Sequence, residues 1–199
     1  MLDKWFEQVV RPRLNGRVAL IRYADDFVLA FASERDARRV AAVLPKRFGK
    51  YGLKLHPEKT RLFRFTPNSG REEDSRSFDF LGFTFYWGQS RKGRWMVKRK
   101  TARSRFTRSL KRLGQWCRAN RHEPIRKQHQ QLARKLRGHY AYYGIAGNSV
   151  ALKRMRYQAL RLWWKWLSRR SRRNDMPWSR FELLLRRYPL PAPAIYHRF

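Results

Sequence analysis

The first regular pattern in the chain is a pair of short apolar runs with acidic residues between them. Residues 18–22 and 27–32 are rich in β-branched and aromatic side chains, and Tyr-Ala-Asp-Asp at 23–26 separates them. Runs of this length and composition, with so few residues between them, predict the two strands of a hairpin. The carboxylates of Asp25 and Asp26 should therefore lie at its tip.

A helix is predicted directly after this hairpin. Ser33 has the chemistry of an N-cap, and Asp36 stands three residues later, as in a capping box. We expect Pro45 to kink the helix and Gly52 to close it. The apolar face that should pack on the hairpin comprises Val40, Val43, Leu44, Phe48 and Tyr51.

Short extended segments follow the helix. Residues 53–55 and 61–65 alternate apolar and basic side chains, which predicts a strand interrupted by a turn. Residues 66–77 are polar and are expected to form a loop. A second hairpin should have residues 78–87 and 94–98 as its arms.

The apolar spacing changes to a helical period from Ser104 onward, so a domain boundary is expected near residue 100. The predicted fold class is α+β: antiparallel hairpins with one packed helix, followed by an all-α domain of three to four helices.

The first of these helices should span about 104–119, the second should begin at Pro124 and end near Gly144, and Asn148 should cap the third. A short helix over about 179–187 and a Pro-rich tail complete the pattern. The inward side chains are predicted to be Phe106, Leu110, Leu113, Trp116 or Cys117, Ile125, Leu132, Leu136, Tyr140, Leu152, Leu160, Trp163, Trp164 and Leu167.

Charge separates the two parts of the chain. The formal net charge is +34, from 48 Lys and Arg against 14 Asp and Glu. Residues 1–74 carry +6 and residues 75–199 carry +28, so a polyanionic partner, nucleic acid, is expected for the second part. The aromatic residues among these cations suit stacking on unpaired bases, but their helical spacing favours packing in a core.

The rest of the composition excludes several classes. A single cysteine, Cys117, excludes an internal disulfide framework and a Cys-cluster zinc site. The histidines lie at no common metal-binding spacing. No apolar run approaches the length of a membrane span and no signal peptide follows Met1, so we expect a cytoplasmic protein without a membrane partner.

The Tyr-Ala-Asp-Asp turn is the candidate for chemistry. Carboxylates held on a tight turn between strands can bind hard divalent cations through oxygen, and nucleotidyl transfer uses two such metals. The alternative is a solvated turn, because Asp is common in turns for reasons of local hydrogen bonding.

Four ordered segments carry a family resemblance. Residues 22–28 around the acidic turn, 51–61 (Tyr-Gly-Leu-Lys-Leu-His-Pro-Glu-Lys-Thr-Arg) and 78–85 (Phe-Asp-Phe-Leu-Gly-Phe-Thr-Phe) resemble successive palm blocks of group II intron reverse transcriptases. Residues 136–144 (Leu-Arg-Gly-His-Tyr-Ala-Tyr-Tyr-Gly) and the Trp-rich, Arg-rich stretch after them resemble the maturase-specific thumb.

This resemblance implies a partial polymerase palm over 1–100 and a maturase-specific helical thumb with a C-terminal tail over 101–199. It implies an RNA-directed DNA polymerase and intron maturase of a retroelement, with Mg²⁺ as cofactor and deoxynucleotides as substrates. Its nucleic-acid partners would be structured intron RNA and an RNA/DNA primer–template duplex.

The resemblance also assigns roles to residues. Asp25 and Asp26 match the metal-binding acids, and Lys59 matches a catalytic lysine near the incoming triphosphate, although it also suits a solvated loop. Leu81 and Gly82 match the turn that supports the primer, although a β-bulge would use the same residues. The predicted RNA-binding residues are Arg137, His139, Tyr140, Tyr143, Arg169, Arg170, Arg172 and Arg173.

The chain departs from the family pattern at its start. The family places another metal-binding aspartate and the fingers upstream of the acidic turn, so we expect an incomplete two-metal site and no polymerase activity from this chain alone. Asp3, Glu7 and Glu34 are the nearby acids, and none lies in a context that suggests a metal ligand. The alternatives are a non-catalytic RNA-binding module that assists splicing, an inert truncated relic, or a chain completed by an N-terminal fragment or a homodimer.

Overall fold

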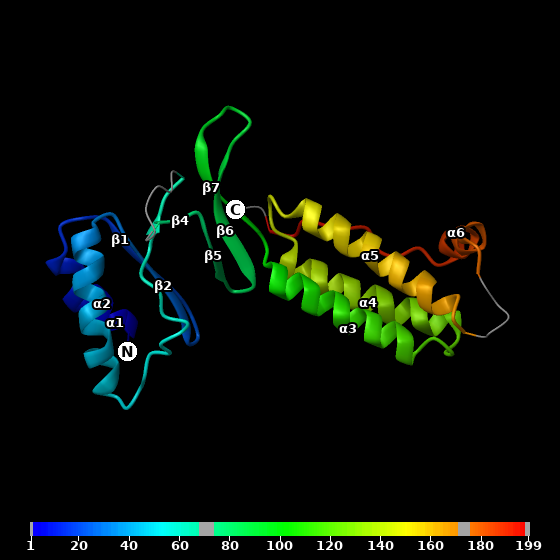
Figure 1. Cartoon of the computed structure of the whole chain (residues 1–199), viewed down its shortest axis with the longest axis horizontal. Coiled ribbons are helices and arrows are strands. Elements are labelled where there is room, and N and C mark those ends of the chain that lie inside the picture. The colour runs from blue at the N-terminus through cyan, green and yellow to red at the C-terminus, as the bar shows by residue number, and fades with distance from the viewer. Residues whose placement is uncertain (1, 68–73, 171–175, 198–199) are drawn as a thin grey trace. The chain divides into compact units, whose positions relative to one another are not determined.

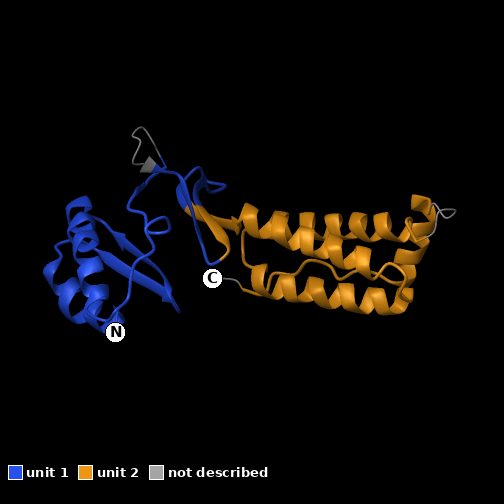
Figure 2. Ribbon diagram, turned by 60° about the horizontal axis from the view of Figure 1, so that its bottom comes forward, with its two compact units in different colours: residues 1–81, 86–96 blue, residues 82–85, 97–199 orange. Residues whose placement is uncertain are grey.

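The computed structural model describes residues 2–67, 74–170 and 176–197. The predicted α+β class is confirmed, with antiparallel strand pairs and long helices (Figure 1). The chain divides into two compact units, which Figure 2 colours separately. Unit 1 consists of Met1–Leu81 and Tyr86–Met96, and unit 2 consists of Gly82–Phe85 and Val97–Phe199. No helix in the described ranges is both long enough and apolar enough to cross a bilayer.

Unit 1 begins with a helical segment that the sequence analysis missed. It consists of α1 (Leu2–Trp5), the π-helical η1 (Phe6–Val10) and the 3-10 turn η2 (Arg11–Arg13). Leu2, Trp5, Phe6 and Val10 are buried in the core of this unit. Their spacing was a readable sign of an amphipathic helix.

The first hairpin is confirmed. Strands β1 (Val18–Tyr23) and β2 (Asp26–Phe31) pair antiparallel, with Val18 opposite Phe31 and Tyr23 opposite Asp26. This register leaves two residues, Ala24 and Asp25, as the turn itself.

Helix α2 (Glu34–Gly49) packs one face on the hairpin, as predicted. The Ser33 hydroxyl accepts a hydrogen bond from the Asp36 backbone N–H at 3.3 Å, which confirms the cap. Val40 and Leu44 are buried, and the Phe48 ring stacks on Phe27 with centroids 5.9 Å apart.

One part of the α2 prediction was wrong. Val43 and Tyr51 are exposed, at 48% and 49%, because the helix covers only a two-stranded sheet and buries a narrower stripe than predicted. The helix ends at Gly49, and Gly52 closes it as predicted, with a positive φ of 68°. The Gly52 N–H donates to the Gly49 carbonyl and the Leu53 N–H donates to the Phe48 carbonyl, both at 3.1 Å, as in a Schellman motif. Pro45 lies inside the helix.

The strand predicted over 53–55 and 61–65 is also largely wrong. Only β3 (Arg64–Phe65) is extended and paired, in parallel with β4 (Asp74–Ser75). The apolar residues of the preceding segment are not buried against a sheet, since Leu53 and Leu62 are about half exposed, at 49% and 52%. Part of the predicted 66–77 loop, residues 68–73, lies outside the described residues.

The second predicted hairpin has three strands instead of two. Strands β5 (Ser77–Phe80), β6 (Phe83–Gln89) and β7 (Trp95–Thr101) form a sheet in that order. A two-residue turn at Leu81 and Gly82 divides the long arm predicted over 78–87. Both residues have positive φ, 49° and 78°, as a tight type I′ hairpin turn requires.

Unit 2 consists mainly of the predicted helices, which begin at α3 (Arg103–Ala119). Helices α4 (Ile125–Tyr143), α5 (Ser149–Leu167) and α6 (Trp178–Arg187) follow. The three long helices lie side by side in both views (Figures 1 and 2). Their core includes Leu113, Leu132, Leu136, Tyr140, Leu152, Met155, Ala159, Trp163 and Leu167.

The Pro-rich tail runs back along α4. His129 Nε2 lies 2.9 Å from the Pro189 carbonyl oxygen near the start of the tail. Further on, the backbone N–H groups of Tyr196 and His197 donate to the Gly144 carbonyl at 2.7 and 3.0 Å. The tail therefore contacts α4 near its beginning and again at its end.

Asn148 stands at the predicted N-cap of α5 but does not cap with its side chain. The side chain is buried and bonds instead to Thr101 at the end of β7 and to the Tyr143 carbonyl. Sequence spacing predicted the position of the helix start but not this partner 47 residues away.

Candidate active-site turn and nucleic-acid interface

The acidic turn of unit 1 is a two-residue connection with an unusual backbone. Ala24 has φ of 54°, a left-handed conformation that a residue with a Cβ rarely adopts. Asp25 follows it in the turn, and Asp26 begins β2. Both carboxylates are exposed to solvent. Backbone strain of this kind concentrates at functional sites, so the turn remains the candidate for metal chemistry.

Arg22 holds this turn in place, a role that the sequence analysis did not predict. Its guanidinium donates to both carboxylate oxygens of Asp3, with the shortest contact at 2.6 Å, and its Nη1 donates to the Ala24 carbonyl at 2.7 Å. The hydrogen bonds from Arg22 lower the pKa of Asp3 below its ordinary value. One guanidinium thus ties α1 to the backbone of the strained residue.

The other acids considered in the sequence analysis are engaged elsewhere. Glu7 pairs with Arg11 at 2.7 Å and Glu34 pairs with Arg38 at 2.9 Å. Within the described residues, no group of three or more His, Cys, Asp or Glu side chains is placed to hold a metal. Asp25 and Asp26 offer the oxygen donors that Mg²⁺ prefers, so they fit part of a metal ligand set.

Lys59 occupies an exposed turn after α2. Its backbone N–H donates to the His56 carbonyl at 3.2 Å, which fixes the turn while the side chain extends into solvent. Its predicted place beside a triphosphate stays a prediction.

Gly82, the residue of the Leu81–Gly82 turn that belongs to unit 2, brings two predicted sites of that unit together. A Cβ on Gly82 would lie 3.1 Å from the Tyr143 hydroxyl and 3.7 Å from Cγ of Arg105. The Ala102 N–H donates to the Gly82 carbonyl at 2.9 Å, which holds the turn against the start of α3. Gly82, predicted for primer binding, therefore lies beside Tyr143, predicted for RNA binding.

An aromatic cluster surrounds this contact. The Phe83 ring stacks on Tyr142 at 5.9 Å and meets Tyr143 edge-on at 5.3 Å. His139 lies 4.6 Å from Tyr143, measured between ring centroids. Tyr142, which the sequence analysis did not select, is 54% exposed. Its signal was its place beside Tyr143 in the predicted thumb motif.

Burial determines the properties of His139 and Tyr140, both predicted to bind RNA. Burial lowers the pKa of His139 to about 4, so its imidazole is neutral at pH 7 and adds no charge toward phosphate. Tyr140 is 1% exposed in the helical core, and burial raises its pKa to about 12. In this arrangement Tyr140 supports the core, as its helical spacing predicted, and its ring is not available at the surface.

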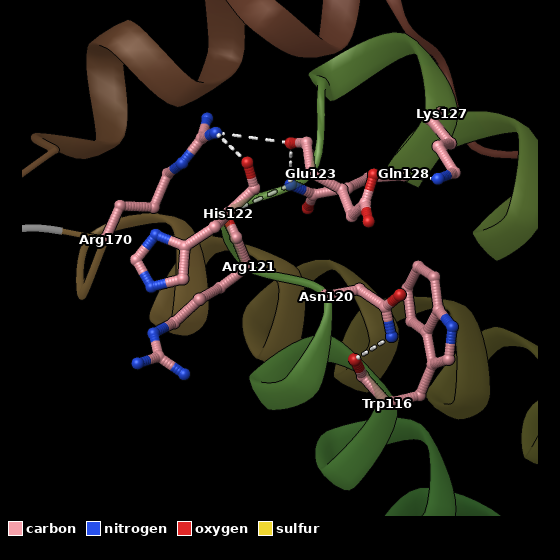
Figure 3. A network of polar contacts seen from close by, with 8 residues as sticks. All are labelled: Trp116, Asn120, Arg121, His122, Glu123, Lys127, Gln128 and Arg170. Carbon is pink, nitrogen blue, oxygen red and sulfur yellow. Dashed lines mark hydrogen bonds and ion pairs between the residues drawn. The ribbon is translucent and has the colours of Figure 1, made fainter.

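The predicted arginines differ in their surroundings. Arg137 on α4 and Arg169 after α5 are exposed. Arg170 donates to the carbonyls of His122 and Glu123 at 3.0 and 3.2 Å, so it fastens the loop between α3 and α4 (Figure 3). Arg172 and Arg173 lie outside the described residues.

Gln128 completes the support of that loop. Its buried amide donates to the carbonyls of Arg121 and Glu123 and accepts a hydrogen bond from the Trp163 indole at 2.9 Å. Figure 3 shows these loop residues together with Arg170. The sequence analysis missed Gln128, because it lies in the polar run Lys-Gln-His-Gln-Gln at 127–131, where nothing in the sequence distinguishes it from exposed side chains.

The surface of the three long helices has one sign of charge. Helices α3, α4 and α5 contain six, five and five Lys or Arg residues and no Asp or Glu. All of these cations except Arg156 are exposed. Such a surface attracts polyanions over its whole length.

Comparison with known proteins found a family-model match in the N-terminal part of the chain. Residues 1–85 match the family model described as reverse transcriptase (RNA-dependent DNA polymerase). A search of curated proteins found no match to the chain. The matched stretch contains the acidic turn, Lys59 and the Leu81–Gly82 turn, and it supports RNA-directed DNA polymerase as the general class and nucleic acid as the partner.

Proposed function

We propose that this chain is the palm-and-thumb part of a group II intron reverse transcriptase and maturase, and that its helical unit binds structured intron RNA and the primer–template duplex. The observation that carries the proposal is the absence of carboxylates from α3, α4 and α5, whose cations are nearly all exposed. Arg predominates among these cations, and its planar guanidinium suits phosphate.

The helical surface binds nucleic acid mainly through phosphates. Each phosphate that a Lys or Arg neutralises releases condensed counterions, so affinity should fall steeply as salt is added. Tyr142, with its exposed ring stacked on Phe83, adds a position where an unpaired base can stack. Structured RNA, which offers both phosphates and unpaired bases, suits this combination.

The acidic turn supplies the catalytic part of the proposal. Asp25 and Asp26 are the residues that would hold Mg²⁺, and Arg22 keeps their turn in its strained conformation. The bound metals would stabilise the attacking and leaving oxygens of nucleotidyl transfer. Two carboxylates supply only part of that ligand set, so synthesis by this unit requires a further carboxylate from another segment or chain.

Lys59 and the Leu81–Gly82 turn complete the proposed assignments in the palm. Lys59 would neutralise the triphosphate of the incoming deoxynucleotide, for which its exposed side chain is suitable. Gly82 packs closely against Tyr143 and has no side chain, so that a primer backbone can approach the backbone of the turn.

A non-catalytic RNA-binding module that assists splicing is the second candidate. The acid-free helices favour it, because binding through them requires neither the metal site nor deoxynucleotides. Primer extension separates the two candidates. Magnesium-dependent synthesis that disappears in Asp25→Asn would establish the enzyme, whereas RNA binding without synthesis would favour the splicing module.

Binding across a salt series tests the surface on which both candidates depend. Replacing Arg126, Arg134 and Arg137 of α4 with Gln should weaken binding of a structured RNA and reduce the log–log salt slope by about 2 to 3. The matched control replaces Arg35 and Lys46 of α2 and Lys50 directly after it with Gln, which removes the same charge from unit 1. Equal effects of the two sets would contradict the assignment of binding to the helices.

A further inference from the structure

Trp166, near the end of α5, lies among three cations. The guanidinium carbon of Arg118, the ammonium nitrogen of Lys165 and the guanidinium carbon of Arg169 each lie 5.7 Å from the centre of the indole ring. A distance of this size is within the range of cation–π attraction. Arg118 comes from the last turn of α3, so two helices contribute to the cluster.

The position of the cluster depends on close packing of those helices. A Cβ on Gly114 of α3 would meet Leu162 of α5 at 3.4 Å, so the two helices approach closely one turn before Arg118 and Trp166. The indole is partly exposed and the Arg118, Lys165 and Arg169 side chains are exposed. A ligand from solvent can therefore reach the ring and the charges together.

The neighbouring tryptophans of α5 have different surroundings. The Trp163 indole donates to buried Gln128 and the Trp164 indole donates to the Met176 carbonyl, both at 2.9 Å. These two rings belong to the helical core. Core packing accounts for them, whereas it does not account for three like charges gathered on Trp166.

Carboxylates do not neutralise this cluster within the described part of unit 2. Glu123 pairs with Lys127 at 2.9 Å, and Glu182 accepts a hydrogen bond from the Trp178 indole at 2.7 Å. The helix C-termini favour nearby cations, which explains the presence of Arg118 and Lys165 but not their convergence on one ring. Mutual repulsion among the three cations favours an anionic ligand.

We propose that Trp166, Arg118 and Arg169 form a subsite for one unpaired nucleotide of a bound RNA strand. The base stacks on the indole, while the arginines contact the phosphates on either side of it. An unpaired nucleotide fits better than a duplex, because bases in a duplex are already stacked on each other. The inference rests on the proposed nucleic-acid binding and adds the kind of strand that this end of the helices accepts.

The test compares two RNAs on the full chain. The first is a fluorescein-labelled oligouridine of twelve nucleotides, and the second is an RNA hairpin whose stem has twelve base pairs. Trp166→Leu should weaken binding of the oligouridine about tenfold, as expected for loss of one stacked base, and change binding of the hairpin less than twofold. The control is Trp95→Leu, which removes an exposed tryptophan from β7 and should change neither affinity.

Salt and cross-linking distinguish the partners within the subsite. Trp166→Leu should leave the salt slope for oligouridine unchanged, whereas Arg118→Gln with Arg169→Gln should reduce it by about 1 to 2. In the unmodified chain, oligouridine carrying one 5-iodouridine should cross-link at Trp166 on irradiation, as located by mass spectrometry. This measurement does not depend on a variant that must fold.

The outcomes separate the two proposals. RNA binding that is equal for Trp166→Leu and the unmodified chain, with the cross-link elsewhere, would overturn the subsite and leave the proposed function standing. Failure of the unmodified chain to bind either RNA at low salt would overturn both.

Discussion

Asn148 and Thr101 are joined by two buried hydrogen bonds across 47 residues of sequence. Asn148 Oδ1 accepts from the Thr101 backbone N–H at 2.9 Å, and Asn148 Nδ2 donates to the Thr101 hydroxyl at 2.8 Å. Nδ2 also donates to the Tyr143 carbonyl at 2.8 Å. One amide therefore fixes the end of β7 to the connection between α4 and α5.

Replacing this amide should destabilise unit 2 strongly. Asn148→Ala leaves a buried N–H and a buried carbonyl without their partner, so we expect a loss of about 2–4 kcal/mol. Urea denaturation followed by far-ultraviolet circular dichroism measures this loss in the free energy of unfolding. Asn120→Ala removes a single partly buried bond to the Trp116 carbonyl and should cost less than half as much. Equal losses in Asn148→Ala and Asn120→Ala would contradict the inference that the hydrogen bonds between Asn148 and Thr101 stabilise unit 2.

Two glycines of the α4 region should respond in opposite directions to alanine. At Gly144 a Cβ would collide with the Tyr140 carbonyl and would lie 2.6 Å from the Ala194 carbonyl, so Gly144→Ala should cost about 1–3 kcal/mol and loosen the tail. At Gly138, inside α4, a Cβ meets nothing within 4 Å. Gly138→Ala should therefore stabilise the helix by about 0.5–1 kcal/mol.

Thermal melting of both variants tests this pair, and limited proteolysis reports on the tail. Cleavage after Tyr196 should accelerate in Gly144→Ala and remain unchanged in Gly138→Ala. Destabilisation of both variants by a similar amount would show that the close contacts of Gly144 with the tail are not the cause of the loss in Gly144→Ala.

His139 should make the helical unit sensitive to acid. Its pKa is about 4 in the folded chain and 6.5 ordinarily, so between these values the unfolded chain binds a proton that the folded chain does not. Stability is therefore fully present above pH 6.5 and falls as pH decreases toward 4. The loss should be roughly 1–2 kcal/mol, because the ring is partly exposed and solvent screens part of the effect.

Comparison of denaturation curves at pH 7.5 and 4.5 measures this dependence. His139→Phe keeps an aromatic ring beside Tyr143 and should reduce the difference between the two curves. His122→Phe, at an exposed loop position, is the control and should preserve the difference. An unchanged difference in His139→Phe would assign the acid sensitivity to other groups.

The contact between Arg22 and Asp3 should be visible in titration. Carbon-detected magnetic resonance of the Asp3 carboxyl should show a pKa below 3.8, because Arg22 hydrogen-bonds to the carboxylate. In Arg22→Gln the pKa should rise toward its ordinary value, and resonances of Ala24 should shift because its carbonyl loses a donor. Arg11→Gln, which removes the partner of Glu7, should leave Asp3 unchanged. A normal Asp3 pKa in the unmodified chain would contradict the contact.

Local patterns predicted much of the fold. The hairpin of β1 and β2 and the Ser33 cap follow from the identity of neighbouring residues, and each was confirmed. The long helices were predicted because apolar spacing near 3.6 residues persists over many turns. The prediction of a strand over 53–55 and 61–65 was largely wrong, because an alternating pattern alone does not supply a partner strand.

The candidate site was predictable where a motif is continuous in sequence. The exposed placement of Asp25 and Asp26 on a turn follows from two apolar runs with acids between them. Arg22, Gln128 and Asn148 act through partners that tertiary folding brings near, so their own neighbours in sequence gave no sign of the contact. The apolar pattern placed Leu81, with its positive φ, within a single strand, because leucine seldom occupies a turn of that kind. The family resemblance, in contrast, indicated a turn at Leu81 and Gly82.

The acid-free helices have an effect on the protein before any RNA is present. Like charges on α3, α4 and α5 repel one another in the compact state and are farther apart in the unfolded chain. Dissolved ions shorten the range of that repulsion, so moderate salt should favour folding of the helical unit while it weakens RNA binding. Ionic strength thus acts on this chain in two opposite directions, and an RNA ligand can serve it as a folding partner as well as a target.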